Sequence, residues 1–479
     1  MKKTVLVILF SWVSSMMALP SYAKNGDNVL ATLSLKAQQR HTQQEVEKLR
    51  GFMQNPKLLL QAEKLLLQNV PRHQLQSFDS LKKLYILANF KSIWSDPALV
   101  NLFMQDYAIF VASGVSKRSL STLNHILASQ KGSAKRDILL SDAFLDYYYF
   151  NKNLKKNINT WLYAPFDYQP SSIKEVDLIA WMNAINSNYG ESFLKKFIPI
   201  DNAIYLATAN KVLSGTLGPK NEQKLALNAQ RLRVIPNFTN GLYVNIPTYQ
   251  LNYFKNGQLA LHSVVVVGKK KRPTPVLFSQ LSDVVVNPPW TVPPTILEKD
   301  VIPKYAKNVG YGAKKGFTVL NYAGKKVDPS SIDWESYKGE NAKKFPYMIR
   351  QKAGKTAALG RYKFNMPSAE AIFLHDTPHK SVFKRKKRAL SSGCVRVEKA
   401  SELGKILLTE AGWSQEKHNQ VYKSEETAYV KIRSANPVYL YYVTSWVEKG
   451  KVNTVSDIYN LDPKFSTNSL DWKSLKMAF

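Results

Sequence analysis

Two hydrophobic patterns divide the chain. From residue 24 to about 210, apolar residues recur every three or four positions, which is the spacing of one face of an α-helix. Asp96 before Pro97 adds a helix-start signal, because Asp caps helix N-termini and Pro suits the first turn. We therefore predict a helical region whose apolar stripes form a core. The segments with this spacing are 30–52, 57–70, 81–94, 97–113 and 136–150.

From about Gly241 the pattern changes to short runs rich in Val, Tyr, Leu and Ile. Asn256-Gly257 lies between two such runs and favours a hairpin turn, because both turn positions need positive φ. We predict a mostly β domain from about residue 235 to 445. Its expected strands are 242–246, 249–254, 258–268, 283–287, 371–374 and 428–444.

Residues from roughly 300 to 357 interrupt the β pattern and are rich in Lys, Gly and Asp. A long insertion of this kind is often a lid or a binding loop. The pattern is equally compatible with a decorated surface loop.

The first 23 residues have the layout of a secretory signal peptide. Lys2 and Lys3 precede a mostly apolar stretch, and small residues surround a possible cleavage site after Ala23. An uncleaved N-terminal anchor is the alternative. No later segment approaches the roughly 20 apolar residues of a membrane span. Export is therefore expected.

The chain is strongly basic, with 67 Lys and Arg residues against 35 Asp and Glu, a formal net charge of +32. Basicity alone raises nucleic acid as a partner. Export and the lack of a nucleic-acid motif argue against that partner. An anionic cell envelope is the better match, although the charge could serve solubility alone.

Cys394 is the only cysteine, so no intramolecular disulfide can form, and it follows His375 by 19 residues. Cysteine catalysis needs a thiolate, and a nearby His can accept the thiol proton. Gly393 permits a tight turn whose backbone N–H groups could face an oxyanion. Arg396 is a planar cation suited to a carboxylate. A buried, inert thiol near an unrelated histidine is the alternative from this spacing.

Two residues close to His375 have alternative interpretations. His379 could be a second ligand or acid, but a solvated loop histidine is the simpler interpretation. A zinc site of Cys394, His375 and His379 is conceivable, yet nothing else in the sequence suggests metal. Asp376 could orient His375, but neighbours on a strand point to opposite faces, so we expect a backbone carbonyl to orient it instead.

Residues 391–396 (Ser-Ser-Gly-Cys-Val-Arg), with His375 upstream, resemble the signature of L,D-transpeptidases with the YkuD catalytic domain. The chain looks closest to the large YcbB-like branch of that family. The segments that carry this closer resemblance are 244–249 (Val-Asn-Ile-Pro-Thr-Tyr), 284–290 (Val-Val-Val-Asn-Pro-Pro-Trp), 359–368 (Leu-Gly-Arg-Tyr-Lys-Phe-Asn-Met-Pro-Ser) and 374–378 (Leu-His-Asp-Thr-Pro).

The resemblance implies an α+β chain: a helical N-terminal scaffold and a mostly β YkuD-type catalytic domain with an inserted lid. It implies a peptidoglycan L,D-transpeptidase of the periplasm that needs no cofactor and no metal ion. The implied organisation is a signal peptide (1–23), a helical scaffold (24–234), a catalytic domain (235–445) with a lid at about 300–357, and a C-terminal tail (446–479).

The implied reaction joins two peptidoglycan stem peptides by a 3–3 cross-link. Cys394 would attack the diaminopimelate carbonyl of a tetrapeptide donor and release D-Ala, with His375 as the base. The resulting thioester would pass to the diaminopimelate amine of an acceptor stem. Backbone N–H groups at Gly393 and Cys394 would line the oxyanion hole, and Arg396 and Ser392 would bind substrate.

Three departures from the family pattern stand out. Many members have His where this chain has Ser392, although the YcbB-like branch also has Ser there. The small peptidoglycan-binding module of that branch is expected to be missing between scaffold and catalytic domain. Phe373 stands where Tyr is common. The same residues could also serve an L,D-carboxypeptidase, a protein-to-peptidoglycan ligase or, without catalysis, a peptidoglycan-binding protein.

Overall fold

The computed structural model describes residues 43–44, 46–433, 436–465 and 470–478, so the expected signal peptide lies outside the described residues. The chain divides into two compact units. The first runs up to Val234 and includes Val447–Gly450 and the segment from Pro463. The second comprises Ile235–Trp446 and Lys451–Asp462. Within the described residues, no helix is both long enough and apolar enough to cross a membrane.

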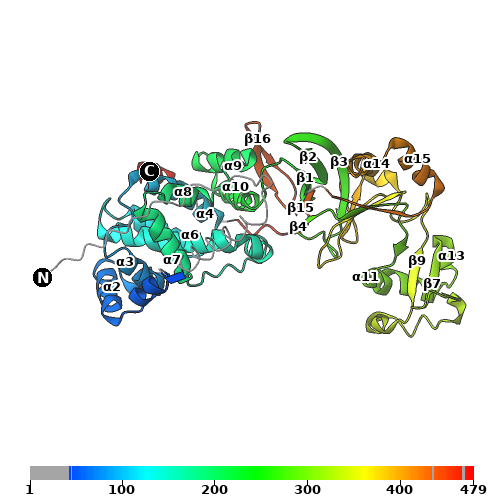
Figure 1. Ribbon diagram of the computed structural model, residues 1–479, viewed down its shortest axis with the longest axis horizontal. Coiled ribbons are helices and arrows are strands. Elements are labelled where there is room, and N and C mark those ends of the chain that lie inside the picture. The colour runs from blue at the N-terminus through cyan, green and yellow to red at the C-terminus, as the bar shows by residue number, and fades with distance from the viewer. Residues whose placement is uncertain (1–42, 45, 434–435, 466–469, 479) are drawn as a thin grey trace, which may run out of the picture. The chain divides into compact units, whose positions relative to one another are not determined.

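The first unit is helical, as the 3.6-residue periodicity predicts (Figure 1). The prediction for 97–113 is confirmed: the Asp96 carboxylate accepts the Ala98 N–H at 2.9 Å and caps that helix. The helix predicted over 81–94 instead ends at Leu87, because Asn89 and Phe90 adopt positive φ. Its helices are α2 (Pro56–Asn69), α3 (Phe78–Leu87), α4 (Pro97–Ser113), α5 (Ser119–Leu127), α6 (Ala134–Trp161), α7 (Glu175–Asn186), α8 (Gly190–Lys195), α9 (Ala203–Leu213), α10 (Pro219–Arg233) and α16 (Trp472–Ala478).

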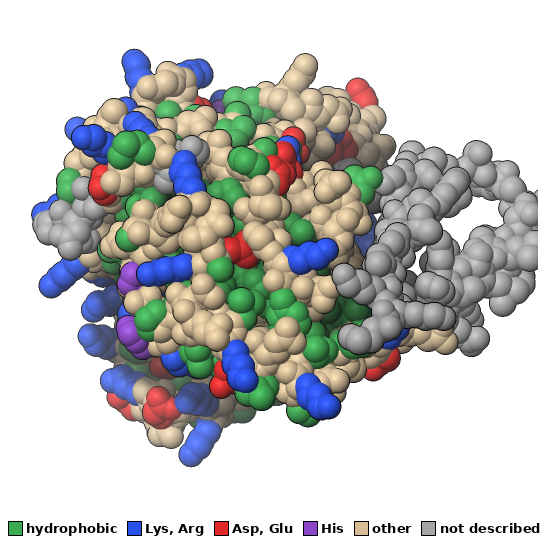
Figure 2. Space-filling model, turned by 90° about the vertical axis from the view of Figure 1, so that its left-hand side faces the viewer, with side chains coloured by type: hydrophobic (Ala, Val, Ile, Leu, Met, Phe, Trp, Pro, Cys, Tyr) green, Lys and Arg blue, Asp and Glu red, His purple; other side chains and the backbone are tan. Residues whose placement is uncertain are grey.

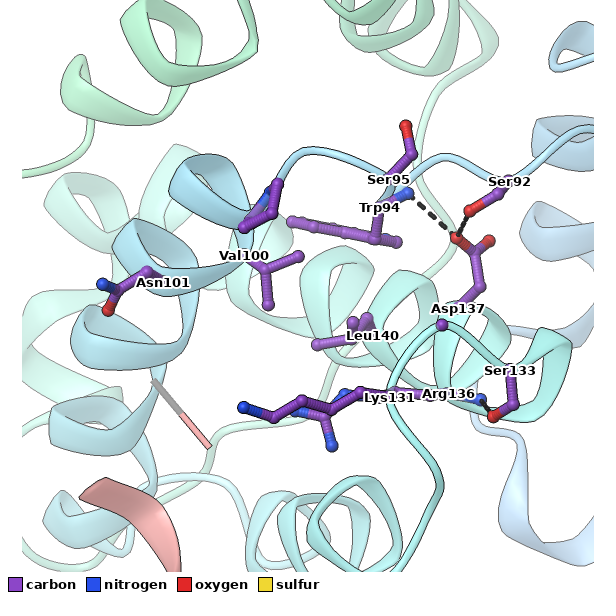
Figure 3. Close-up of a pocket in the computed structure, with 12 residues that line it drawn as sticks. Ser92, Trp94, Ser95, Val100, Asn101, Lys131, Ser133, Arg136, Asp137 and Leu140 are labelled. Atoms are coloured by element: carbon purple, nitrogen blue, oxygen red, sulfur yellow. Dashed lines mark hydrogen bonds between the residues drawn. The ribbon is translucent and has the colours of Figure 1, made fainter. Parts of the chain in front are cut away.

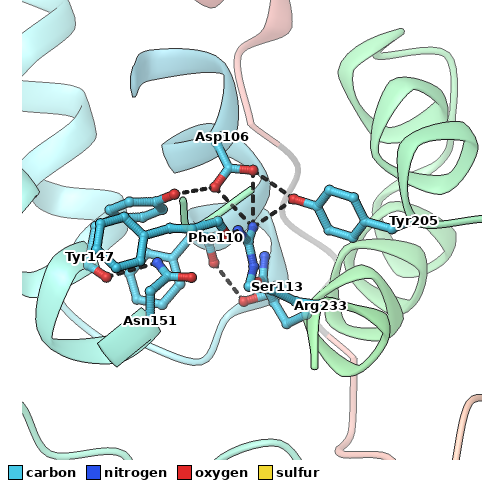
Figure 4. A network of polar contacts seen from close by, with 9 residues as sticks. Asp106, Phe110, Ser113, Tyr147, Asn151, Tyr205 and Arg233 are labelled. Atoms are coloured by element: carbon cyan, nitrogen blue, oxygen red, sulfur yellow. Dashed lines mark hydrogen bonds and ion pairs between the residues drawn. The ribbon is translucent and has the colours of Figure 1, made fainter. Parts of the chain in front are cut away.

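A buried polar network joins α4, α6, α9 and α10 (Figure 4). The Asp106 carboxylate accepts hydrogen bonds from the hydroxyls of Tyr147 (2.5 Å) and Tyr205 (2.7 Å). Arg233 pairs with the same carboxylate at 2.9 Å. Burial acts to lower the pKa of Arg233, but the Asp106 charge outweighs that effect and the pKa is raised. The network therefore fixes four helices around one ion pair.

The last described helix, α16, belongs to the helical unit. The Trp472 indole donates to Glu222 of α10 at 2.6 Å. Gly215 has positive φ, and a Cβ there would lie 2.6 Å from the Trp472 ring. The segment 446–479, expected as a tail, is therefore shared between both units, and its end completes the helical one.

The second unit is built on a curled, mostly β sheet, and with the helical unit it confirms the α+β prediction. The strands follow the order β14-β5-β10-β11-β13-β3-β2-β1-β15-β4, and β12 pairs with β3. Asn256 and Gly257 have φ of 50° and 79°, which confirms the predicted hairpin between β2 and β3. The strands are β1 (Gly241–Asn245), β2 (Gln250–Lys255), β3 (Gln258–Gly268), β4 (Leu277–Gln280), β5 (Asp283–Val286), β10 (Tyr362–Asn365), β11 (Leu374–His375), β12 (Ala389–Ser391), β13 (Val395–Val397), β14 (Ala428–Lys431) and β15 (Pro437–Tyr441).

The structure of this unit differs from the sequence prediction in three details. The strand expected over 371–374 is only Leu374–His375, because Ala371 adopts positive φ and breaks the extended backbone. The run 428–444 contains two strands, β14 and β15, rather than one. Two helices were not predicted, namely α14 (Ala400–Glu410) and α15 (Gln415–Ser424). A short hairpin of β16 (Ser445–Glu448) and β17 (Lys451–Thr454) follows.

The chain between β5 and β10 forms a small subdomain with its own sheet, ordered β6-β9-β7-β8. We call residues 290–351 the insertion; it begins earlier than the predicted 300–357. Tyr305 and Trp334 stack at its centre, with ring centroids 4.0 Å apart. Its own core makes it a folded element and not an irregular surface loop. Its elements are β6 (Trp290–Thr291), α11 (Pro294–Ile296), a π-helix (Leu297–Val301), α12 (Ile302–Lys307), α13 (Tyr311–Lys315), β7 (Phe317–Leu320), β8 (Lys326–Val327) and β9 (Met348–Gln351).

Lys and Arg side chains are scattered over the face shown in Figure 2, with few Asp and Glu side chains among them. This distribution agrees with the sequence, where basic residues occur along the whole chain. A dispersed positive surface attracts anionic surroundings over distances of about one Debye length, roughly 8–10 Å at physiological ionic strength.

Candidate functional site

Strand register brings the predicted catalytic residues onto one face of the sheet. β11 and β13 run parallel, with His375 opposite Arg396. β10 lies on the other side of β11, with Lys363 opposite His375. Paired residues share a face, as do positions i and i+2 of one strand. Cys394 comes immediately before β13, and the charges of Lys363 and Arg396 act on its thiol, which places it beside this face.

Cys394 stands immediately before β13 and is partly exposed. The backbone of Phe373, at the entry to β11, hydrogen-bonds to its thiol. Burial raises the pKa of the Cys394 thiol, although the Phe373 hydrogen bond and the charges of Lys363 and Arg396 act in the opposite direction. The resting group is therefore a thiol at neutral pH.

The turn before Cys394 is held by hydroxyl groups. Gly393 has φ of +122°, a conformation that side chains resist. Its carbonyl accepts the Thr274 hydroxyl at 2.6 Å, and its N–H donates to Ser391 Oγ at 3.2 Å. The Cys394 carbonyl accepts the Ser391 hydroxyl at 2.6 Å. The Cys394 N–H has no acceptor among the described residues, which leaves it free to donate to a ligand.

His375 is buried, with 6% of its surface exposed. Burial first, and then the Arg396 charge, lower its pKa to about 3. Its Nδ1 lies 2.5 Å from the Asp376 carbonyl, which can only accept, so Nδ1 carries the proton. A neutral ring protonated on Nδ1 has a free lone pair on Nε2, and that lone pair can accept a proton.

Asp376 contributes its backbone carbonyl to His375, as expected, while its carboxylate serves another purpose. The carboxylate accepts the Arg361 N–H at 2.9 Å and pairs with Lys380 at 2.5 Å. Gly360, with φ of +60°, leaves room for it, because a Cβ there would lie 2.4 Å from Asp376 Oδ2. This carboxylate fixes the start of β10 and does not orient the histidine.

Two cations lie on the same face as the imidazole, with the thiol beside it. Arg396 is partly buried, its Nε has no hydrogen-bond partner among the described residues, and burial lowers its pKa. Lys363 also has a pKa lowered by burial, and its Nζ lies 4.4 Å from the centre of the Phe373 ring. Sequence reasoning missed Lys363. No local pattern marked it, because it enters the site only through its pairing with His375.

Ser392 is exposed and links the site to the insertion. Its Oγ accepts a hydrogen bond from Arg272 Nη1 at 3.1 Å. The same Arg272 nitrogen pairs with Asp300 of the insertion. The residue expected to bind substrate therefore also touches a cation that ties the insertion to the catalytic turn.

His379 is exposed and lies in a loop, as the simpler interpretation predicts. Within the described part of the chain, no three His, Cys, Asp or Glu side chains are grouped so as to hold a metal ion.

Alkylation of Cys394 by iodoacetamide is expected to speed up about tenfold per pH unit between pH 6 and 8, because only the thiolate reacts and its pKa is raised. Lys363→Met should slow the reaction at each pH, since it removes a charge that favours the thiolate. Exposed Lys355→Met should not. Rates would be measured by intact mass. A pH-independent plateau from pH 5 to 8 would instead indicate a preformed thiolate–imidazolium pair.

Comparison with known proteins adds to this geometry. Residues 239–411 match the family description "L,D-transpeptidase catalytic domain" (YkuD), and residues 79–210 match "Scaffold domain". A Haemophilus influenzae protein named "Putative L,D-transpeptidase" is 44% identical over 408 residues, covering 84% of this chain and 82% of that protein.

Two solved structures are also similar, each 12% identical over 42% of this chain with a TM-score of 0.19. One is an L,D-transpeptidase from Mycobacterium smegmatis, of which 57% is covered. The other is the Ldtfm-avibactam carbamoyl enzyme, of which 48% is covered. At this TM-score they carry no argument about the fold. The catalytic-domain match and the 44% identity over most of both chains show that this protein belongs to the L,D-transpeptidase family.

Proposed function

We propose that this protein forms 3–3 cross-links between peptidoglycan stem peptides through a thioester on Cys394. The observation that carries the proposal is the face on which His375 pairs with Arg396, with the Cys394 thiol beside it. Together these groups provide a nucleophile, a neutral base and a cation. These are the parts needed to bind a carboxylate-bearing peptide and transfer its acyl group.

In the proposed acylation, Cys394 Sγ attacks the diaminopimelate carbonyl carbon of a tetrapeptide donor, and His375 Nε2 accepts the thiol proton. The oxyanion accepts the Cys394 N–H, which has no acceptor among the described residues. The C–N bond to D-Ala then breaks, and the leaving amine takes the proton from His375. The products are a thioester and free D-Ala.

In the second step, the side-chain amine of an acceptor diaminopimelate attacks the thioester carbonyl. His375 accepts a proton from that amine and returns it to the Cys394 sulfur as the thioester bond breaks. Arg396 and Lys363 bind a stem carboxylate, and Ser392 lies at the edge of the binding surface. Over the two steps, one amide bond is broken and one amide bond is formed.

The proposed setting is the periplasm, reached through the N-terminal signal peptide. Two features support it: the basic, apolar layout of residues 1–23 and a net charge of +32 suited to an anionic envelope. The insertion, which has a core of its own and contacts Ser392 through Arg272, is proposed as the lid over the bound stem.

The test is intact-protein mass spectrometry of the chain incubated with a disaccharide-tetrapeptide, beside a Cys394→Ala control. We expect an acyl adduct that has lost D-Ala, together with a cross-linked dimer, and neither in the control. Shortened stems without dimer would instead favour the L,D-carboxypeptidase. If the chain bound sacculi without forming an adduct or a product, it would be a binding protein and the proposal would fail.

A further inference from the structure

The helical unit contains a pocket of about 510 Å³ that the proposed chemistry does not use. Pockets that hold small molecules typically measure about 300–1,000 Å³. The pocket lies where α4 and α6 begin, and its lining includes Pro97, Val100, Ser133 and Arg136 from their first turns. Both helices are long, and the partial positive charge at their N-terminal ends favours an anion there.

Arg136 lines this pocket and is 5% exposed. Its Nη1 donates to the carbonyls of Ile126 (2.8 Å) and Ser129 (3.4 Å). Its Nη2 is buried and has no hydrogen-bond partner among the described residues. Burial lowers its pKa, and no other cause accompanies it. A buried guanidinium with one free donor nitrogen is a strong binding group for a carboxylate oxygen.

The net charge of the residues that line the pocket favours a ligand with a single negative charge. Lys131 and Arg136 are cationic and Asp137 is anionic, which leaves one net positive charge. The Asp137 carboxylate is already saturated, because it accepts the hydroxyls of Tyr85 and Ser92 and the N–H groups of Ile93 and Trp94. It therefore has no remaining capacity to pair with Arg136, and the free positive charge belongs to the Arg136 side of the pocket.

Apolar side chains form much of the rest of the lining. In Figure 3, Trp94 lies on one side of the pocket and Lys131 and Arg136 on the other, with Val100 and Leu140 between them. An apolar lining of this kind can bury the apolar part of a ligand, while the cations bind the polar end of the same ligand. We propose that this pocket binds a monoanionic carboxylate attached to an apolar group, either a free small acid or the C-terminus of a short peptide.

The proposal is tested by titrating the full chain with two pairs of probes and following binding by calorimetry. One pair is 3-phenylpropanoate and 3-phenylpropanamide; the other is N-acetyl-alanyl-phenylalanine and its C-terminal amide. The acids should bind saturably, and the amides about tenfold more weakly or worse, because a charge-assisted hydrogen bond is lost. Binding of only the free acid, or of only the peptide acid, would identify the source of the carboxylate.

The variant chosen to test the site is Asn101→Asp, which adds a negative charge to the lining. Asn101 Oδ1 accepts Gln105 Nε2 at 2.8 Å, a bond that Asp can keep, and an acid near a helix N-terminus does not disfavour folding. Substituting Arg136 itself would also remove the donor to Ile126 and Ser129 and could unfold the unit. We expect Asn101→Asp to weaken binding of the acids at least about fivefold, from the loss of net positive charge.

A second variant, Lys131→Met, removes a cation from the pocket lining. Its matched control is Lys155→Met, at an exposed position of α6 that does not line the pocket. Lys131→Met should weaken acid binding and Lys155→Met should leave it unchanged. The proposal would be overturned by equal binding of acid and amide, or by wild-type affinity in Asn101→Asp. It would also be overturned if no saturable binding appeared up to about 10 mM acid, which is well above the roughly 1 mM Kd of a weak site.

Discussion

Replacing His375 by Gln is expected to slow acylation of Cys394 by the donor stem at pH 7 by about 10²–10⁴-fold, the usual contribution of a general base. The Cys394 thiol has a raised pKa, so at neutral pH it needs a base to become a nucleophile. His375 is suited to that role because its pKa of about 3 keeps the ring neutral and its Nδ1 donates to the Asp376 carbonyl. Gln keeps a polar group there but offers no basic nitrogen.

A pH series separates this role from a structural one. Below the raised pKa of the Cys394 thiol, the thiolate that forms without a base increases about tenfold per pH unit. The defect of His375→Gln should therefore shrink by at least about tenfold between pH 7 and pH 10, whereas a misfolded variant would stay slow at every pH. Exposed His379→Gln is the matched control and should acylate at the wild-type rate. A defect of constant size across the pH range would show that His375 does not act as the base. Acylation would be followed by intact-protein mass spectrometry of samples quenched at set times.

The parts of the fold that could be predicted from sequence are those fixed by local chemistry. The Asp96-Pro97 cap predicted α4, and Asn256-Gly257 predicted the β2–β3 hairpin, because each depends on residues next to one another. The segment 428–444 was harder. The sequence interrupts its strand-like residues with Arg-Ser-Ala-Asn-Pro at 433–437, but only pairing shows that β14 joins β5 while β15 joins β1 and β4.

The candidate site was predictable only in part for a similar reason. Cys394 and His375 stand out by type, spacing and resemblance, but Lys363 enters the site through its register with His375 across β10 and β11. Gly393 N–H was expected in the oxyanion hole, and in the fold it donates to Ser391 Oγ at 3.2 Å. Contacts of this kind depend on how distant strands and turns meet, which a linear pattern does not encode.

The buried polar network of the helical unit could not be predicted from sequence for the same physical reason. Asp106 is the only charged residue of α4, within a mostly apolar run, and nothing near it in sequence neutralises it. Its partners come from α6, α9 and α10, between 41 and 127 residues away. A buried carboxylate of this kind is stable only if every acceptor site is used. That requirement leads to a sharp prediction about stability.

Asp106→Ala is expected to destabilise the helical unit by about 3–5 kcal/mol, because it leaves the Arg233 charge buried without its partner. It also removes the acceptor of the Tyr147 and Tyr205 hydroxyls. The measurement is native-state hydrogen exchange of peptides from α4, α6 and α10, which reports the opening free energy of this unit without assuming two-state unfolding of the whole chain. The matched control is Glu191→Gln, which breaks the exposed Glu191–Lys195 pair at 3.0 Å. That change should lower the opening free energy by less than about 0.5 kcal/mol.

A double variant distinguishes an uncompensated charge from a simple loss of packing. Asp106→Leu combined with Arg233→Met removes both charges and restores apolar volume, so it should be less destabilising than Asp106→Ala alone. If the double variant were the worse of the two, the network would contribute through its many hydrogen bonds, including Arg233 Nη1 to the Phe197 carbonyl at 2.7 Å, more than through the ion pair. If Asp106→Ala lowered the opening free energy no more than Glu191→Gln does, the Arg233 charge would have found another partner, and the ion pair would not be what holds these helices together.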